Sequence, residues 1–177
     1  MPVGDFAYYD HVLNTSLLFG VVPKRHQAAD GEIDFDCQFR MGRGRAPTGP
    51  VGAACDMTKW FNTNYHYLVP EFNAEQQFKL TDLSLFNQIK EAKALGLNFK
   101  VVLPGPVTYL HCGKVAEGVN KLDLLPALLA AYQQLLDALN DALKDTASWI
   151  QLDEPVLALE LDKDWLSAIQ TSYRSLQ

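Results

Sequence analysis

The chain has 177 residues, of which 48% are apolar, and a formal net charge of −6 at pH 7. This length and apolar content suffice for one domain with a sizeable core. The negative charge argues against a general nucleic-acid binder and against a protein that binds membrane surfaces, because either needs a basic face. An anionic ligand must therefore be held by a few placed cations.

The cysteines and the amino terminus favour a cytoplasmic protein. Cys37, Cys55 and Cys112 are odd in number and include no C-x-x-C pair, so neither a disulfide framework nor a zinc finger is indicated. No basic segment followed by an apolar run opens the chain, and no apolar stretch reaches the ~20 residues of a membrane span. We therefore expect a reducing, cytoplasmic environment and no membrane association.

The first third of the chain predicts a strand end, a helix and a long irregular segment. Residues 2–6 (PVGDF) are typical of a strand end, and Asp10 is placed to cap the apolar helix that follows. The loosest region is about residues 20–54, in which glycines and prolines cluster around residues 43–50. This predicts a flexible loop or crossover, with one short helix near residues 35–41.

The middle of the chain predicts a second strand, a helix and a third strand. Aromatic residues are dense at residues 57–67, which favours a strand. Thr81 and Asp82 then open a helix that Gly96 ends. Residues 98–103 (NFKVVL) form a short apolar strand before a Pro-Gly-Pro turn.

The last third predicts two helices around a strand. Residues 122–143 give the longest periodic helix, with apolar positions at the three-and-four spacing of one buried face. Residues 149–152 (WIQL) form the last clear strand, which ends at Asp153 and Glu154. A helix over about residues 163–176 closes the chain.

Strands that alternate with helices imply parallel strands joined by crossovers, in a doubly wound sheet or a (β/α) barrel. No G-x-G-x-x-G follows a strand, and polar residues gather where strands finish, as they do at the mouth of a barrel. A full barrel takes ~250 residues and eight strands. We therefore expect residues 1–177 to be a partial TIM-type barrel domain of about four parallel strands with flanking helices. The polar or turn-forming residues at the strand ends are Asp5, Thr58, Lys59, Gly105, Thr108, Asp153 and Glu154.

Three segments hold residue types suited to a site. Asp153 and Glu154 suit general acid/base work or ligand orientation, although one carboxylate can equally cap the next segment while the other pairs with a lysine. The GPVT segment at residues 105–108 offers a modest anion-binding nest, which turn formation explains as well. Lys59 stands among hydroxyls, amides and aromatic rings and can pair with a carboxylate tail, or be a solvated lysine outside a packed strand.

A metal site is not indicated. His111 and Cys112 are the only adjacent pair of soft ligands, whereas a zinc site needs three or four protein ligands. The other histidines show no local partnering with this pair, and the arginines of the irregular segment form a basic run that fits a solvated face better than a phosphate clamp. These residues are His11, His26 and His66, and Arg40, Arg43 and Arg45.

Taken together, these segments resemble the cobalamin-independent methionine synthase family over nearly the whole chain. The strongest match is MTKWFNTNYHY at residues 57–67, followed by VPEF at residues 69–72. The other matches come in the family's order: PVGDF at 2–6, RGRAPTG at 43–49, GPVTYL at 105–110, YQQ at 132–134 and QLDEP at 151–155. Asp56 stands where the family usually has glutamate, and His111-Cys112 where a more apolar or aromatic pair is expected.

The resemblance implies a methyltransferase that moves a methyl group from 5-methyltetrahydropteroyltriglutamate to homocysteine, making methionine without cobalamin. It implies two facing barrels, with zinc and homocysteine held by the carboxyl-terminal barrel. Lys59 matches the family's lysine that contacts the glutamate tail, so it is the one substrate-binding residue expected here. No catalytic residue and no zinc ligand is expected in this chain.

The sequence therefore predicts part of a methyltransferase that supplies folate-tail binding and scaffold, and is inactive alone. A first alternative is a non-catalytic half-barrel that binds or assembles with another chain, since an open parallel sheet has unpaired edges and tends to self-associate. A second alternative is a separate small enzyme that uses Asp153 and Glu154. The same carboxylates occur in the full-length family, which places this alternative last.

Overall fold

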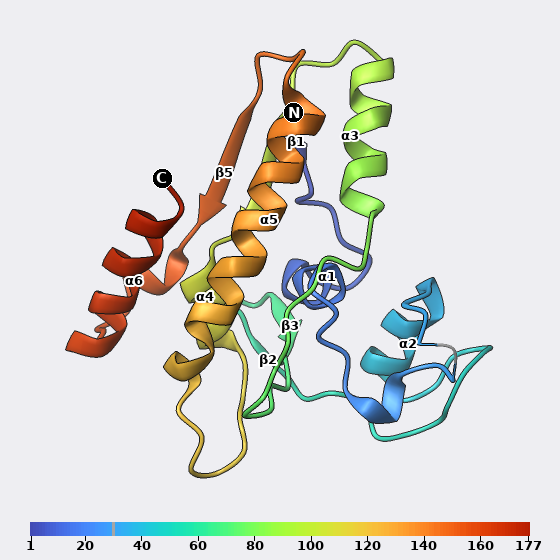
Figure 1. Ribbon diagram of the computed structural model, residues 1–177. Helices are drawn as coiled ribbons and strands as arrows, with labels where there is room; N and C mark the ends of the chain where they lie inside the picture. The colour runs from blue at the N-terminus through green and yellow to red at the C-terminus, as the bar shows by residue number, and fades with distance from the viewer. Residues whose placement is uncertain (30) are drawn as a thin grey trace.

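A three-stranded parallel sheet lies at the centre of the fold, as the computed structural model of residues 1–29 and 31–177 shows (Figure 1). The strands are β1 (Pro2–Val3), β4 (Lys100–Pro104) and β5 (Trp149–Asp153), in the order β1-β4-β5. The apolar strand at 98–103 and the strand at 149–152 are thus confirmed to within two residues. The expected number of about four parallel strands is wrong for the described residues, in which three strands form an open sheet and not a closed barrel.

The segment at residues 57–67 is the source of that error, because it folds as a hairpin and not as one strand. β2 (Met57–Lys59) pairs antiparallel with β3 (His66–Leu68). The amide of Trp60 donates a hydrogen bond of 2.7 Å to the carbonyl of Tyr65 and closes the turn. The polar residues Asn-Thr-Asn between the aromatics are typical of a turn, and they mark this reversal in the sequence.

All five expected helices are present, with boundary changes of at most three residues. The expected helix at 81–96 is shorter, because Asp82 accepts from the amide of Ser84 at 2.8 Å and the helix proper begins there. A helix that the sequence analysis did not predict follows β4. The helices of the described chain are α1 (His11–Leu18), α2 (Phe35–Arg43), α3 (Ser84–Ala94), α4 (Pro106–Cys112), α5 (Leu125–Leu143) and α6 (Lys163–Ser175). Short 3-10 turns occupy Lys24–His26, Lys121–Leu124 and Pro155–Ala158.

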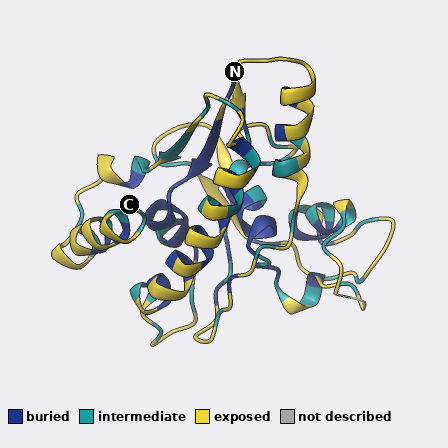
Figure 2. Cartoon of the chain, turned by 45° about the horizontal axis from the view of Figure 1, so that its top comes forward, coloured by how far each residue is buried: buried dark blue, intermediate teal, exposed yellow. Residues whose placement is uncertain are grey.

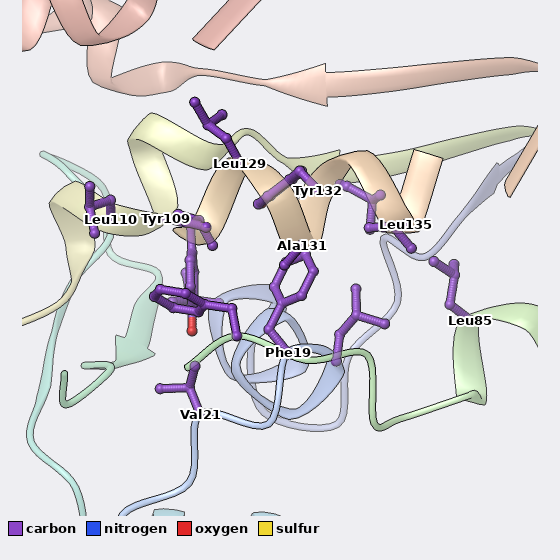
Figure 3. Packing of buried hydrophobic residues seen from close by; sticks show 14 of the residues in the cluster. Phe19, Val21, Leu85, Tyr109, Leu110, Leu129, Ala131, Tyr132 and Leu135 are labelled. Carbon is purple, nitrogen blue, oxygen red and sulfur yellow. The ribbon is translucent and has the colours of Figure 1, made fainter. Parts of the chain in front are cut away.

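The main core forms where the buried face of α5 meets α1, α4 and the sheet (Figure 3). Tyr132 of α5 packs against Phe19, with 4.8 Å between ring centroids, and its hydroxyl donates to the carbonyl of Pro104 at 2.7 Å. Tyr109 of α4 is fully buried and hydrogen-bonds Ser16 of α1 at 3.0 Å. Each buried aromatic or leucine contributes about 1.5–3 kcal/mol by leaving water. Exposed residues lie on the outer faces of the helices (Figure 2).

A second, smaller core organises the region expected to be a flexible loop or crossover. Seven buried side chains from α1, α2, β3 and the segments between them make up this second cluster: Leu13, Leu17, Val22, Cys37, Met41, Cys55 and Leu68. The part of the chain that carries α2 lies beyond α1, away from the sheet (Figure 1). The predicted short helix is confirmed. The flexibility of the rest of the segment stays a prediction.

Arg40 of α2 is fully buried at the centre of this region. Its Nε donates to the carbonyl of His26 at 2.9 Å, one terminal nitrogen to the carbonyl of Thr48 at 3.0 Å, and the other to the carboxylate of Asp34 at 2.9 Å. Asp34 also caps α2 by accepting from the amide of Cys37. The guanidinium therefore joins three stretches of irregular backbone, and it does not belong to a solvated basic face as expected from the sequence.

Asp10 joins α1 to the hairpin. One carboxylate oxygen caps α1 by accepting from the amide of Leu13 at 2.6 Å, as predicted, and the other accepts from the amide of Leu68 at 2.9 Å. The side chain is almost completely buried, and burial raises its pKa to about 6 despite these hydrogen bonds. The hairpin is thus fixed over the amino end of α1, close to the sheet.

Candidate functional site

A cavity of about 460 Å³ opens at the carboxyl ends of all three parallel strands. Its wall contains residues of β4, the last residue of β5 and the two residues after it, and the two residues that follow β1. One residue each from α1 and the hairpin turn completes the wall. The lining residues are Gly4, Asp5, His11, Trp60, Val102, Leu103, Pro104, Asp153, Glu154 and Pro155. Strand-end polar residues therefore meet at one edge, as the sequence analysis expected for Asp5, Asp153 and Glu154. Thr58, Lys59, Gly105 and Thr108 do not line the cavity.

His11 is the lining residue that sequence reasoning missed. Its ring meets Trp60 edge-on with 4.4 Å between centroids, and it stacks near Tyr65 at 5.8 Å. Burial lowers the pKa of His11, while the negative charges of Asp5 and Asp153 act in the opposite direction. Burial therefore disfavours the charged form of an imidazole that lies between an aromatic wall and two carboxylates. The only feature of the sequence that could have indicated a role for His11 was its position at the start of the helix after Asp10.

Glu154 fills the anion-binding nest predicted at residues 105–108. The nest is the amino end of α4, and the Glu154 carboxylate accepts from the amide of Val107 at 3.0 Å and from the amide of Thr108 at 2.6 Å. The hydroxyl of Tyr173 in α6 donates to the same carboxylate at 3.0 Å. A helix amino end attracts a carboxylate in this way. The predicted nest thus holds a group of the chain itself.

Burial raises the pKa of Glu154 above its ordinary value and outweighs the hydrogen bonds that favour the carboxylate. A carboxyl group held by two backbone amides and one phenol has little freedom to move protons to a substrate. Asp153 is more exposed and accepts a hydrogen bond of 2.7 Å from the side-chain amide of Gln151. Of the two adjacent acids, Asp153 is therefore the one available to a ligand.

Lys59 ends β2, on the hairpin and outside the cavity wall. Its side chain is exposed, and it stands opposite His66 in the antiparallel register. Its ammonium makes no hydrogen bond or ion pair with the part of the chain that the structure describes. The next residue, Trp60, does line the cavity. Lys59 is thus a surface cation, unpaired among the described residues, one residue away from the cavity wall.

The described residues offer no metal site. His111 lies half-buried in α4, edge-on to Trp165 with 5.0 Å between centroids, and Cys112 is buried. Within residues 1–29 and 31–177, no three His, Cys, Asp or Glu side chains gather closely enough to hold a metal ion. A zinc ion like the one implied for the family does not fit any donor set here. Likewise, no helix in the described ranges is both long and apolar enough to cross a membrane.

Comparison with known proteins gives a match along the whole chain. The family model described as "Cobalamin-independent synthase, N-terminal domain" matches residues 1–177. Proteins named 5-methyltetrahydropteroyltriglutamate–homocysteine methyltransferase from Yersinia enterocolitica and Yersinia pestis are each 58% identical to all of this chain, and one from Citrobacter koseri is 57% identical. The chain spans 23% of the length of these relatives. The chain therefore belongs to the cobalamin-independent synthase family and corresponds to part of its N-terminal domain.

Proposed function

We propose that this chain is part of a cytoplasmic methyltransferase that makes methionine by moving a methyl group from 5-methyltetrahydrofolate polyglutamate to homocysteine. The observation that supports this most is the 58% identity, over the full chain, to relatives that carry this name. Within such an enzyme, this part would supply scaffold and folate-tail binding. Activation of the homocysteine thiol would fall to a zinc ion elsewhere in the full-length protein, because the described residues contain no donor set for it.

The open sheet supports a partial TIM-type barrel as the architecture of this part. Its three strands are parallel, and its polar cavity lies at their carboxyl ends, where the sites of such barrels lie. Neither outer edge, on β1 or on β5, pairs with another strand of the described chain. Further strands of a full-length protein would pair along these edges.

Lys59 is our proposed contact for the glutamate tail. The tail is a polyanion, and the chain as a whole is negative, so binding depends on a cation that no carboxylate of the protein already neutralises. Lys114, Arg25 and Arg40 are each engaged by a carboxylate within 3 Å, whereas Lys59 is exposed and unpaired among the described residues. The aromatic hairpin holds the Lys59 backbone in a fixed place.

Replacing Lys59 by alanine is expected to weaken binding of triglutamate about tenfold, because one charge-assisted contact contributes about 1.5 kcal/mol or more. Isothermal titration of the native chain, Lys59→Ala and the matched control Lys144→Ala at low salt measures this. Lys144 is equally exposed but lies at the end of α5. Equal weakening by both substitutions would show that only overall charge matters, and no change at Lys59 would refute the assignment.

A second candidate, an assembly module, is favoured by the unpaired edge at β5. Trp149 at the start of this strand is 80% exposed, which is unusual for a tryptophan in a monomer. We expect the isolated chain to associate through its sheet edges, so that its weight-average mass in sedimentation equilibrium rises with protein concentration. Trp149→Lys should reduce the association, whereas Leu166→Lys on α6 should not. A native chain that remains monomeric at every concentration would count against this candidate.

A further inference from the structure

We propose that the cavity at the strand ends binds a small organic cation, namely a protonated amine with an apolar body. The inference does not depend on the role of Lys59, which lies outside the cavity wall. The volume of about 460 Å³ falls in the range of small-molecule pockets, about 300–1,000 Å³. The chemistry of the lining decides which kind of molecule fits.

The charged groups of the wall are all acidic. Asp5 and Asp153 lie on opposite outer strands, where β1 and β5 end, with no lysine or arginine among the lining residues. Neither carboxylate forms an ion pair with a described residue, and Asp153 accepts from the neutral amide of Gln151. Burial lowers the pKa of His11, which lies between them, and so disfavours a positive charge there. Two carboxylates with no cation among the lining residues therefore face the cavity, and they repel an anion and attract a cation.

The other lining groups indicate an organic cation. Val102, Leu103 and Pro104 form an apolar floor, and the half-buried indole of Trp60 forms a wall that His11 and Tyr67 hold edge-on. An indole ring attracts an organic cation through its π face. A bare divalent metal would need more ligands, and the described residues provide no group of three. An apolar body on the floor with an ammonium at the carboxylates satisfies both parts of the lining.

Glu154 reaches the same wall, but its carboxylate is already used. It accepts from the amides of Val107 and Thr108 and from the hydroxyl of Tyr173. Ligand recognition therefore rests on Asp5 and Asp153. The experiment therefore replaces Asp5 and Asp153 and leaves Glu154 unchanged.

The probe is phenethylammonium, compared with phenylacetate and 2-phenylethanol, which have similar bodies but a negative and no charge. Isothermal titration of the 177-residue chain at low salt should show that, of the three compounds, only the amine binds. Asp5→Asn and Asp153→Asn should each weaken it about tenfold, because each removes one charge-assisted contact. The matched control Asp145→Asn removes an exposed carboxylate beyond the end of α5 and should leave binding unchanged.

Three outcomes would overturn the proposal. These are no binding of phenethylammonium at millimolar concentration, binding of phenylacetate or 2-phenylethanol with equal affinity, and unchanged amine affinity in an Asp5→Asn, Asp153→Asn double variant. Thermal unfolding of every variant accompanies the titration. If one single variant fails to fold, the other carries the comparison, because the two residues lie on different strands.

Discussion

Replacing Arg40 by alanine is expected to lower the free energy of unfolding by about 3 kcal/mol, because it removes the buried centre of a hydrogen-bond network. The guanidinium is fully buried and donates to two backbone carbonyls and to Asp34. Its loss leaves these acceptors without their donor and opens a void beside Gly49, where an added Cβ would lie 2.6 Å from a guanidinium nitrogen. Urea unfolding followed by circular dichroism measures the effect.

Arg43→Ala is the matched control for this measurement. Arg43 lies one turn further along α2, is exposed, and contacts the ring of Phe39 with its guanidinium carbon 5.4 Å from the centroid. Such an exposed contact contributes about 0.5–1 kcal/mol. If Arg40→Ala and Arg43→Ala lower the free energy of unfolding equally, the buried contacts of Arg40 do not stabilise residues 20–54 more than an exposed arginine does.

Replacing Glu154 by glutamine is expected to cost about 2 kcal/mol at pH 7, because it leaves one buried amide without an acceptor. Both carboxylate oxygens accept from buried backbone amides of α4. A glutamine of the same shape has one acceptor oxygen, and its NH₂ group would face the other amide. Thermal or urea unfolding measures the loss, with Glu160→Gln as the control, since Glu160 is exposed and lies between the last 3-10 turn and α6.

The pH dependence of this difference has a definite sign. Burial raises the pKa of Glu154 above its value in the unfolded chain, so folding favours the protonated form. That stabilisation is complete below the unfolded pKa, about 4.3, and is lost as the pH rises through the folded pKa. The gap in unfolding free energy between the native chain and Glu154→Gln should therefore be wider at pH 4 than at pH 7. A gap that widens with rising pH would mean that the hydrogen bonds outweigh burial.

Much of the fold could be predicted because its signals are local. The periodicity of residues 122–143 and the cap at Asp10 predicted α5 and the start of α1. α4 was missed because seven residues are too few for a clear period, although Pro106 at its first turn is typical of a helix start. The hairpin was missed because aromatic residues favour strands but do not indicate where the chain reverses direction. The polar turn inside it was the signal that could have separated β2 from β3.

The site was predictable only in part, because it depends on which strands are neighbours. Strand-end residues Asp5 and Asp153 were identified, but the order β1-β4-β5 that brings them to one cavity is a property of the tertiary structure. The structural alternative for the Asp153-Glu154 pair was a cap on the next segment and an ion pair with a lysine. Glu154 instead caps the earlier helix α4, and Asp153 accepts from Gln151. Lys59 was selected by resemblance, and its binding role stays a prediction.

Strand β1 cannot pair with β4 until the chain has reached residue 101, because its register partners are Lys100 and Val101. The second cluster, in contrast, draws all its members from the stretch between Leu13 and Leu68. Closing a long loop costs conformational entropy before any contact is gained, so pairings distant in sequence form slowly. During synthesis, α1, α2 and the hairpin can therefore associate first and hold the amino-terminal residues near the place where the later strands will arrive.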